Sequence, residues 1–352
     1  MNDTVPLVAE WDILALPNSI RTSLAVLNLL IASVGICGNL FVLHASRVHR
    51  ALKIDRVSVI FLESLAVSDI LMSCALYLPT AVTLLAGRWL LGEAFCFVTR
   101  IVVVSAVYNE TLVVALLSFY RLWMLRKPPG ARKDINIRMV YLSAVLLNFV
   151  GAGVFVIIYF VHPAWEEWDS SVENCCKIGG LFNLDSKRKL SVISFLPTLI
   201  FVLIPMVITV LTTLKIFQVF LGMDNKMGRN HERAYRVIKL LLFVCVTFVI
   251  SYLVLVISSF YNTFIGTTPV ALRATVIYFL SINVISNPFI YVIISPHFRG
   301  YMTACVRRVR GPCCRGRVSV EPTCTQVKYH DSERHSTLGK SEGMVARNVS
   351  QE

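Results

Sequence analysis

The sequence Asn287-Pro288-Phe289-Ile290-Tyr291 lies near the end of a long apolar stretch, the seventh such stretch in the chain. A proline inside a helix removes one backbone hydrogen bond and clashes with the preceding turn, so a membrane helix that carries one needs polar neighbours. Asn283 and Asn287, four residues apart and therefore on one helical face, are suited to that task. The stretch is predicted to be a kinked membrane helix with a role beyond spanning; the simpler alternative is an apolar helix that is only kinked.

The composition is that of a membrane protein. Of the 352 residues, 56% are hydrophobic and 16% are charged, and the mean hydropathy is +0.67. A helix needs roughly 20 apolar residues to cross a bilayer, and the stretches that reach this length lie at about residues 24–46, 57–85, 97–124, 139–161, 190–220, 237–260 and 271–294. The predicted fold class is an all-α membrane protein, a bundle of seven transmembrane helices whose termini lie on opposite sides of the membrane.

Basic residues predict the orientation of the bundle. With the N-terminus outside, the three inner loops (residues 47–56, 125–138 and 221–239) hold 14 Lys and Arg, against five in the outer loops. The positive-inside rule then predicts a multi-pass plasma-membrane protein with an extracellular N-terminus and a cytoplasmic C-terminus. The net charge of +13 is mostly on the inner surface, where it suits anionic membrane lipids or an acidic cytosolic partner. Nucleic acid is not an expected partner.

The chain divides into an extracellular tail, a membrane domain, a short interfacial eighth helix and a disordered cytosolic tail, predicted at residues 1–23, 24–294, 295–310 and 311–352. Between Phe298 and Val309, apolar residues recur at helical spacing with arginines on the other faces, which is typical of an amphipathic helix at a membrane surface. Beyond Gly311 the residues are polar, with too little apolar surface to build a core.

Covalent modification is predicted at both ends. Asn2 begins the sequon Asn2-Asp3-Thr4 on the outer tail and is the candidate for glycosylation. Cys313 and Cys314 follow the last membrane stretch on the reducing side, where thiols near the membrane are candidates for palmitoylation. The alternative for these two cysteines is that they are free thiols.

A disulfide bond is chemically permitted on the outer side. Cys96 lies at the outer start of the third helix, while Cys175 and Cys176 lie together in the second outer loop. Disulfides persist in the oxidising extracellular compartment, so a bridge from Cys96 to Cys175 or to Cys176 would tie this loop to the helix. The sequence leaves the choice between the adjacent cysteines open.

Short motifs occur in a fixed order along the chain: Gly38-Asn39, Leu65-Ala66-Val67-Ser68-Asp69, Trp89-Leu90-Leu91-Gly92 before Cys96, Arg121 with Pro128, Pro205, Asn287 to Tyr291, and Phe298-Arg299. Together they resemble the rhodopsin-like, class A G-protein-coupled receptors over roughly residues 20–310. The resemblance implies a receptor that binds an extracellular ligand and activates a heterotrimeric G protein at its inner face. It implies no enzyme activity.

Two carboxylic residues, Asp69 and Glu110, lie within membrane stretches, where ionisable groups are expensive and functional by default. In the family, the position matching Asp69 binds sodium with a small hydroxyl residue of the third helix, where this chain has Glu110, and with asparagines of the seventh helix. Two carboxylates in one apolar site cannot both ionise cheaply. One hypothesis is a proton- or cation-sensitive switch of Asp69, Glu110, Asn283 and Asn287, with sodium at Asp69; the other is a protonated Glu110 that is a fixed hydrogen-bond donor.

Arg121 resembles the arginine that holds the inactive state in this family and then meets the G protein, acting with Asn287, Pro288 and Tyr291. The usual acid before it and the usual tyrosine after it are replaced by Tyr120 and Leu122. The inactive state is therefore expected to be less tightly held, unless Glu232 of the sixth helix substitutes for the missing acid. The alternative is that Arg121 only extends to the lipid headgroups.

The ligand is only weakly indicated. Val103 occupies the position of the aspartate that amine receptors carry, which disfavours an amine. Arg100, Tyr108, Tyr252 and Tyr278, in the outer half, suit a peptide or a small acidic molecule. The alternative is that the aromatic residues serve helix packing and the membrane interface.

Other functional classes are less well supported. The altered neighbours of Arg121 and the absence of the usual tryptophan and proline from Phe248 to Tyr252 leave open a non-signalling decoy or trafficking receptor. A transporter or channel would be expected to carry internal repeats, and we find none. The cytosolic tail holds serines and threonines that a receptor kinase could phosphorylate for arrestin binding, a further pair of expected partners.

Overall fold

The computed structural model places the described residues in one compact unit, residues 1–307, and residues 308–352 form a second unit that contains none of them. The structure describes residues 17–48, 56–126, 136–161, 195–221, 229–265, 269–294, 300, 302 and 303. The predicted eighth helix is represented in this set only by its residues 300, 302 and 303, so it stays a prediction. The two predicted tails lie outside the described residues except for residues 17–23.

All regular structure in the described residues is helical. The elements are α1 (Asn18–Val48), α2 (Arg56–Met72), the π-helical turn η2 (Ser73–Tyr77), α3 (Leu78–Ala86), α4 (Gly92–Arg126), α5 (Ile137–Val161), α8 (Leu196–Thr198), η5 (Leu199–Leu203), α9 (Ile204–Leu221), α10 (Arg229–Phe264) and α11 (Val270–Ile294). Because α2, η2 and α3 are continuous, and so are α8, η5 and α9, these elements make up seven long rods. They agree with the seven predicted stretches and confirm the seven-transmembrane fold class.

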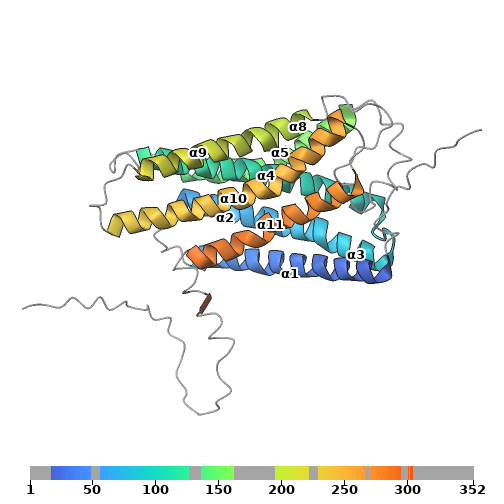
Figure 1. The fold of residues 1–352 in the computed structure, drawn as a ribbon. Helices are drawn as coiled ribbons and strands as arrows, with labels where there is room; N and C mark the ends of the chain where they lie inside the picture. Colours follow the sequence, from blue (N-terminus) through green and yellow to red (C-terminus); the bar gives the residue numbers. More distant parts are fainter. Residues whose placement is uncertain are drawn as a thin grey trace, which may run out of the picture. The chain divides into compact units, whose positions relative to one another are not determined.

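Six of the rods within the described residues are long and apolar enough to cross a membrane. The seventh, α11, has 25 residues but includes buried polar side chains such as Ser281, Asn283 and Asn287. In Figure 1 the long helices lie side by side with nearly parallel axes. The third rod, α4, is central, because it contacts α2, α5 and α9.

Each π-helical turn ends two positions before a proline. Pro79 follows η2 and Pro205 follows η5, and a proline has no N–H to donate to the carbonyl four residues earlier. For Pro205 that carbonyl belongs to Phe201, and the Thr111 hydroxyl of α4 donates to it at 2.5 Å. A side chain of the central helix therefore stabilises the widened turn.

The surface is apolar and the interior holds polar groups, as expected for a protein surrounded by lipid. On α5, Phe149 and Leu146 are 66% and 56% exposed. By contrast, Asn39, Asp69 and Glu110 are almost completely buried. Buried polar groups in this setting must be satisfied by one another, and their partners define the candidate site.

The first helix packs closely against its neighbours through glycines. A Cβ atom on Gly38 would lie 2.8 Å from Cγ of Pro288, and one on Gly35 would overlap the Ser73 hydroxyl. Only glycine permits such an approach. Gly38, part of the first sequence motif, thus brings α1 against the proline of α11.

Candidate functional site

Four sequence-predicted residues meet in the interior between α2, α4 and α11. Asp69 comes from α2, Glu110 from α4, and Asn283 and Asn287 from α11, and each side chain is at most 2% exposed. The Asn283 amide donates to Glu110 Oε2 at 2.6 Å, and the Asn287 amide donates to Asp69 Oδ2 at 2.9 Å. We call these four residues and Tyr252 the carboxyl cluster.

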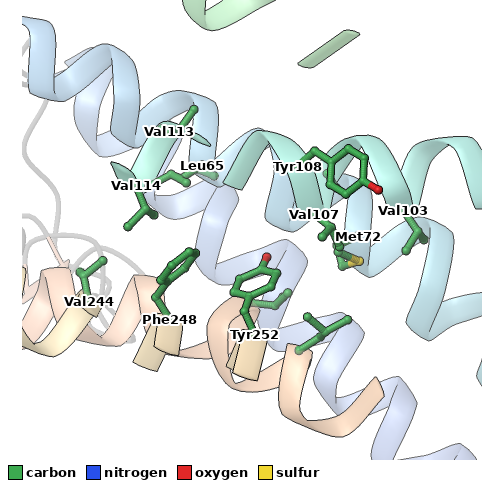
Figure 2. Close-up of a cluster of buried hydrophobic side chains, with 14 of the residues drawn as sticks. Leu65, Met72, Val103, Val107, Tyr108, Val113, Val114, Val244, Phe248 and Tyr252 are labelled. Atoms are coloured by element: carbon green, nitrogen blue, oxygen red, sulfur yellow. The ribbon is translucent and has the colours of Figure 1, made fainter. Parts of the chain in front are cut away.

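Tyr252 of α10 is the fifth member. Its hydroxyl donates to Glu110 Oε2, the same oxygen that accepts from Asn283. Its ring is fully buried and lies 4.8 Å from the ring of Phe248, centroid to centroid. Both side chains project from α10 toward α4 (Figure 2). Tyr252 was predicted to line the outer ligand pocket; the helical spacing of Phe248 and Tyr252 was the signal that both face the interior.

The two carboxyl groups of the cluster are neighbours, because their amide donors Asn283 and Asn287 lie one turn apart on α11. Asp69 Oδ1 and Glu110 Oε1 receive no hydrogen bond from the described residues. The third buried charged residue of the described set, Arg100, lies ten positions before Glu110 on α4, or about 15 Å along the helix. The hydrogen bonds that stabilise the pair therefore come from the neutral donors Tyr252, Asn283 and Asn287.

The proline of α11 is satisfied differently from the prediction. Pro288 has no N–H for the carbonyl of Val284, and the amide of Asn39 on α1 donates to this carbonyl at 3.2 Å. Asn283 and Asn287 were predicted to satisfy the freed backbone, but their amides donate to the carboxyl groups instead. The expectation was wrong because it considered only residues of the same helix.

The five residues predicted for the ligand pocket have different partners. Tyr108 stacks on Phe201 at 5.0 Å between ring centroids, and the Tyr278 hydroxyl accepts a hydrogen bond of 3.2 Å from Asn28. Tyr252 belongs to the carboxyl cluster. The remaining two, Arg100 and Val103, are buried on α4. A common ligand pocket for all five stays a prediction.

A scan against protein families matches the 7 transmembrane receptor (rhodopsin family) model over residues 38–291. The chain belongs to the rhodopsin family of seven-transmembrane receptors. This confirms the resemblance drawn from the motifs, and the family is one of receptors rather than enzymes. The matched range includes every member of the carboxyl cluster.

Among curated proteins, the receptor is 23% identical to the C3a anaphylatoxin chemotactic receptor of Danio rerio over 281 residues, which cover 78% of this chain and 73% of that protein. It is 25% identical to Chemerin-like receptor 1 of Sus scrofa over 41% of this chain and 39% of that protein. It is 31% identical to the G-protein coupled receptor moody of Drosophila pseudoobscura pseudoobscura over 34% of this chain and 18% of that protein.

The inner end of the receptor is described in part. Arg121 is half-buried near the end of α4, beside the contacting rings of Tyr120 and Trp123, whose centroids are 6.1 Å apart. Tyr291 lies in the last turn of α11 and Glu232 in the first turns of α10, but their side chains are outside the described part of the receptor. The proposed partnership of Arg121 with Glu232 therefore stays a prediction.

The predicted modification sites are also only partly within the described residues. Cys96 is buried at the outer start of α4 and is disulfide-bonded, whereas Cys37, Cys74 and Cys245 are free. Its two candidate partners, like the predicted glycosylation and palmitoylation sites, lie outside the described residues: Cys175, Cys176, Asn2, Cys313 and Cys314. Pairing with either loop cysteine stays a prediction.

Proposed function

We propose that this receptor binds an extracellular ligand near the outer ends of its helices and activates a heterotrimeric G protein at its inner face. The observation that supports this most is the carboxyl cluster, which joins α2, α4, α10 and α11 by hydrogen bonds in the middle of the bundle. Such a junction couples the helices that carry the outer aromatic residues to those that carry Arg121 and Tyr291. In this proposal the N-terminus is extracellular.

Arg121 is the residue we assign to contact with the G protein. It lies near the inner end of α4, the helix that contributes Glu110 to the cluster, and α11 carries Asn287, Pro288 and Tyr291 toward the same end. Tyr120 precedes it in place of the acid that is usual in the resembling family, so the restraint that this acid would supply is missing from the sequence. We therefore expect signalling without ligand.

The ligand we propose is a peptide or a small molecule without an amine. Val103 offers no carboxylate to an amine. Two relatives have names that refer to C3a anaphylatoxin and to chemerin, which makes these the first ligands to test. Arrestin, a receptor kinase and membrane lipids are the further partners we propose.

A non-signalling receptor is the second candidate. The observation that favours it is the replacement of both usual neighbours of Arg121 by Tyr120 and Leu122. In that case the receptor would bind its ligand and carry it into the cell without nucleotide exchange.

The two candidates are separated by guanine-nucleotide exchange on a panel of G proteins, with the full chain expressed at the cell surface. We expect exchange without ligand that is lost in Arg121→Ala, because the G protein loses its contact. Arg126→Ala is the matched control, since Arg126 is exposed in the last turn of the same helix. Absence of exchange with and without C3a anaphylatoxin and chemerin, at normal surface levels, would contradict coupling and favour the second candidate.

A further inference from the structure

We propose that the Asp69–Glu110 pair holds a proton in place of the sodium ion that the family resemblance implies, so that this receptor is independent of sodium. The proposal concerns the free receptor and does not require that it activates a G protein. It rests on the contacts of the carboxyl cluster and on the kind of atom that each neighbour presents.

The neighbours of the pair are donors. Asn283 and Tyr252 direct an N–H and an O–H at Glu110 Oε2, and Asn287 directs an N–H at Asp69 Oδ2. A cation is held by oxygen lone pairs, whereas hydrogens that point into a site repel it and stabilise an anion. The three donors therefore suit a single negative charge on the carboxyl pair.

The nearness of the two carboxyl groups suits a proton. Their amide donors, Asn283 and Asn287, lie one turn apart on α11, and a hydrogen bond between two neighbouring carboxyl groups exists only if one of them is protonated. Two buried anions in contact would repel each other in a medium of low dielectric constant. The residues present thus do not fit sodium.

Glu110 is the residue that makes this site differ from the sodium site that the family resemblance implies. It occupies the place of a small hydroxyl residue in the resembling family, and it is 1% exposed. Its side chain fills this position and brings a second carboxyl group to Asp69. Its removal is expected to leave Asp69 as a lone carboxylate beside vacant volume, which is the arrangement that can accept sodium.

The test is thermal unfolding of the purified, ligand-free receptor in sodium chloride and in choline chloride at equal ionic strength. We expect the wild-type Tm to be the same in both salts. Glu110→Gln keeps the volume and presents an N–H in place of the carboxylic O–H, so its Tm is also expected to be independent of sodium. In Glu110→Ser we expect sodium to raise the Tm, saturably, by about 3 °C.

Two outcomes would overturn the proposal. One is a wild-type Tm that rises and saturates with sodium, which would mean that the pair binds the cation. The other is a folded Glu110→Ser receptor whose Tm ignores sodium, which would mean that Glu110 is not what excludes it. Glu110→Ala supplies the same comparison should the serine variant fail to fold. The first outcome needs no variant, because it is decided by the wild-type Tm in the two salts.

Discussion

Two polar clusters are built from successive residues of the same two helices, and they differ in charge. Asp69 and Glu110 point toward α10 and α11, as described above. The residue just before each, Ser68 on α2 and Asn109 on α4, points toward α5 instead, where the Asn109 amide donates to Ser68 at 2.6 Å. With Ser64 and Asn148, these two residues form what we call the neutral cluster.

The members of the neutral cluster bond to one another because they both donate and accept, and only Asn109 Oδ1 among their described side-chain atoms is buried without a hydrogen-bond partner. Asn109 and Asn148 donate to the hydroxyl of Ser64 at 3.2 and 3.4 Å, and the Asn148 carbonyl lies 3.5 Å from the Ser68 hydroxyl. Ionised carboxylates only accept, so the carboxyl cluster needs donors from two further helices and a proton. The neutral cluster therefore binds neighbouring helices together, while the carboxyl cluster has a protonation state and a charge that variants can change.

The largest expected effect comes from forcing α5 away from α4. A Cβ atom on Gly151 would overlap Cα of Ser105 and lie 2.9 Å from its backbone nitrogen. Backbone cannot move aside as a side chain can, so Gly151→Val is expected to lower the free energy of unfolding by about 3 kcal/mol, as measured by chemical denaturation. Gly153→Val is the control, because a Cβ there meets nothing within 4 Å. Equal losses in the two variants would refute the close approach.

The second-largest loss of stability is expected when one hydrogen bond of the carboxyl cluster is removed. Tyr252→Phe removes the hydroxyl that donates to Glu110 and keeps the ring against Phe248. Since a hydrogen bond to a charged or charge-sharing group is worth more than a neutral one, we expect a loss of about 2 kcal/mol in the free energy of unfolding.

The control for this variant is Tyr108→Phe, which preserves the stacking of the ring on Phe201. We expect it to lower the free energy of unfolding far less than Tyr252→Phe does. Equal stability of Tyr252→Phe and the wild-type receptor would count against a role for Tyr252 in the cluster.

The smallest effect is expected in the neutral cluster. Asn148→Ala removes its two contacts with α2, and hydrogen bonds between membrane helices are worth about 0.6 kcal/mol on average, so we expect a loss near 1 kcal/mol. Ser143→Ala on the same helix is the control, because that hydroxyl bonds only within α5, to Val140, among the described contacts. A loss larger than that of Tyr252→Phe would reverse the ranking of the two clusters.

The fold was predictable from the sequence because long apolar stretches can only be helices in a bilayer. The same argument singled out Asp69 and Glu110, since a carboxyl group in such a stretch is expensive. It could not assign Tyr252 or Asn39, because a tyrosine or asparagine in a membrane helix has several plausible partners. Which one it meets depends on how helices distant in the sequence rotate against each other.

The prediction for Pro288 shows the limit most clearly. The predicted donors, Asn283 and Asn287, lie on the same helix as Pro288, whereas the observed donor, Asn39, lies 245 residues earlier than Val284, on α1. The close approach of α1 at Gly38 makes this contact possible. Local periodicity predicts which face a residue occupies, but not which helix lies opposite.

The central claim, that the Asp69–Glu110 pair holds a proton, is tested most directly by infrared difference spectroscopy of the purified receptor, wild type minus Glu110→Gln, at neutral pH. We expect the carbonyl stretch of a buried, protonated carboxylic acid in the wild type. This band should be missing from the variant whichever residue carries the proton, because the side-chain amide introduced by the substitution would then donate an N–H to an ionised Asp69. Only carboxylate bands in the difference spectrum would contradict the account and show that both groups are ionised.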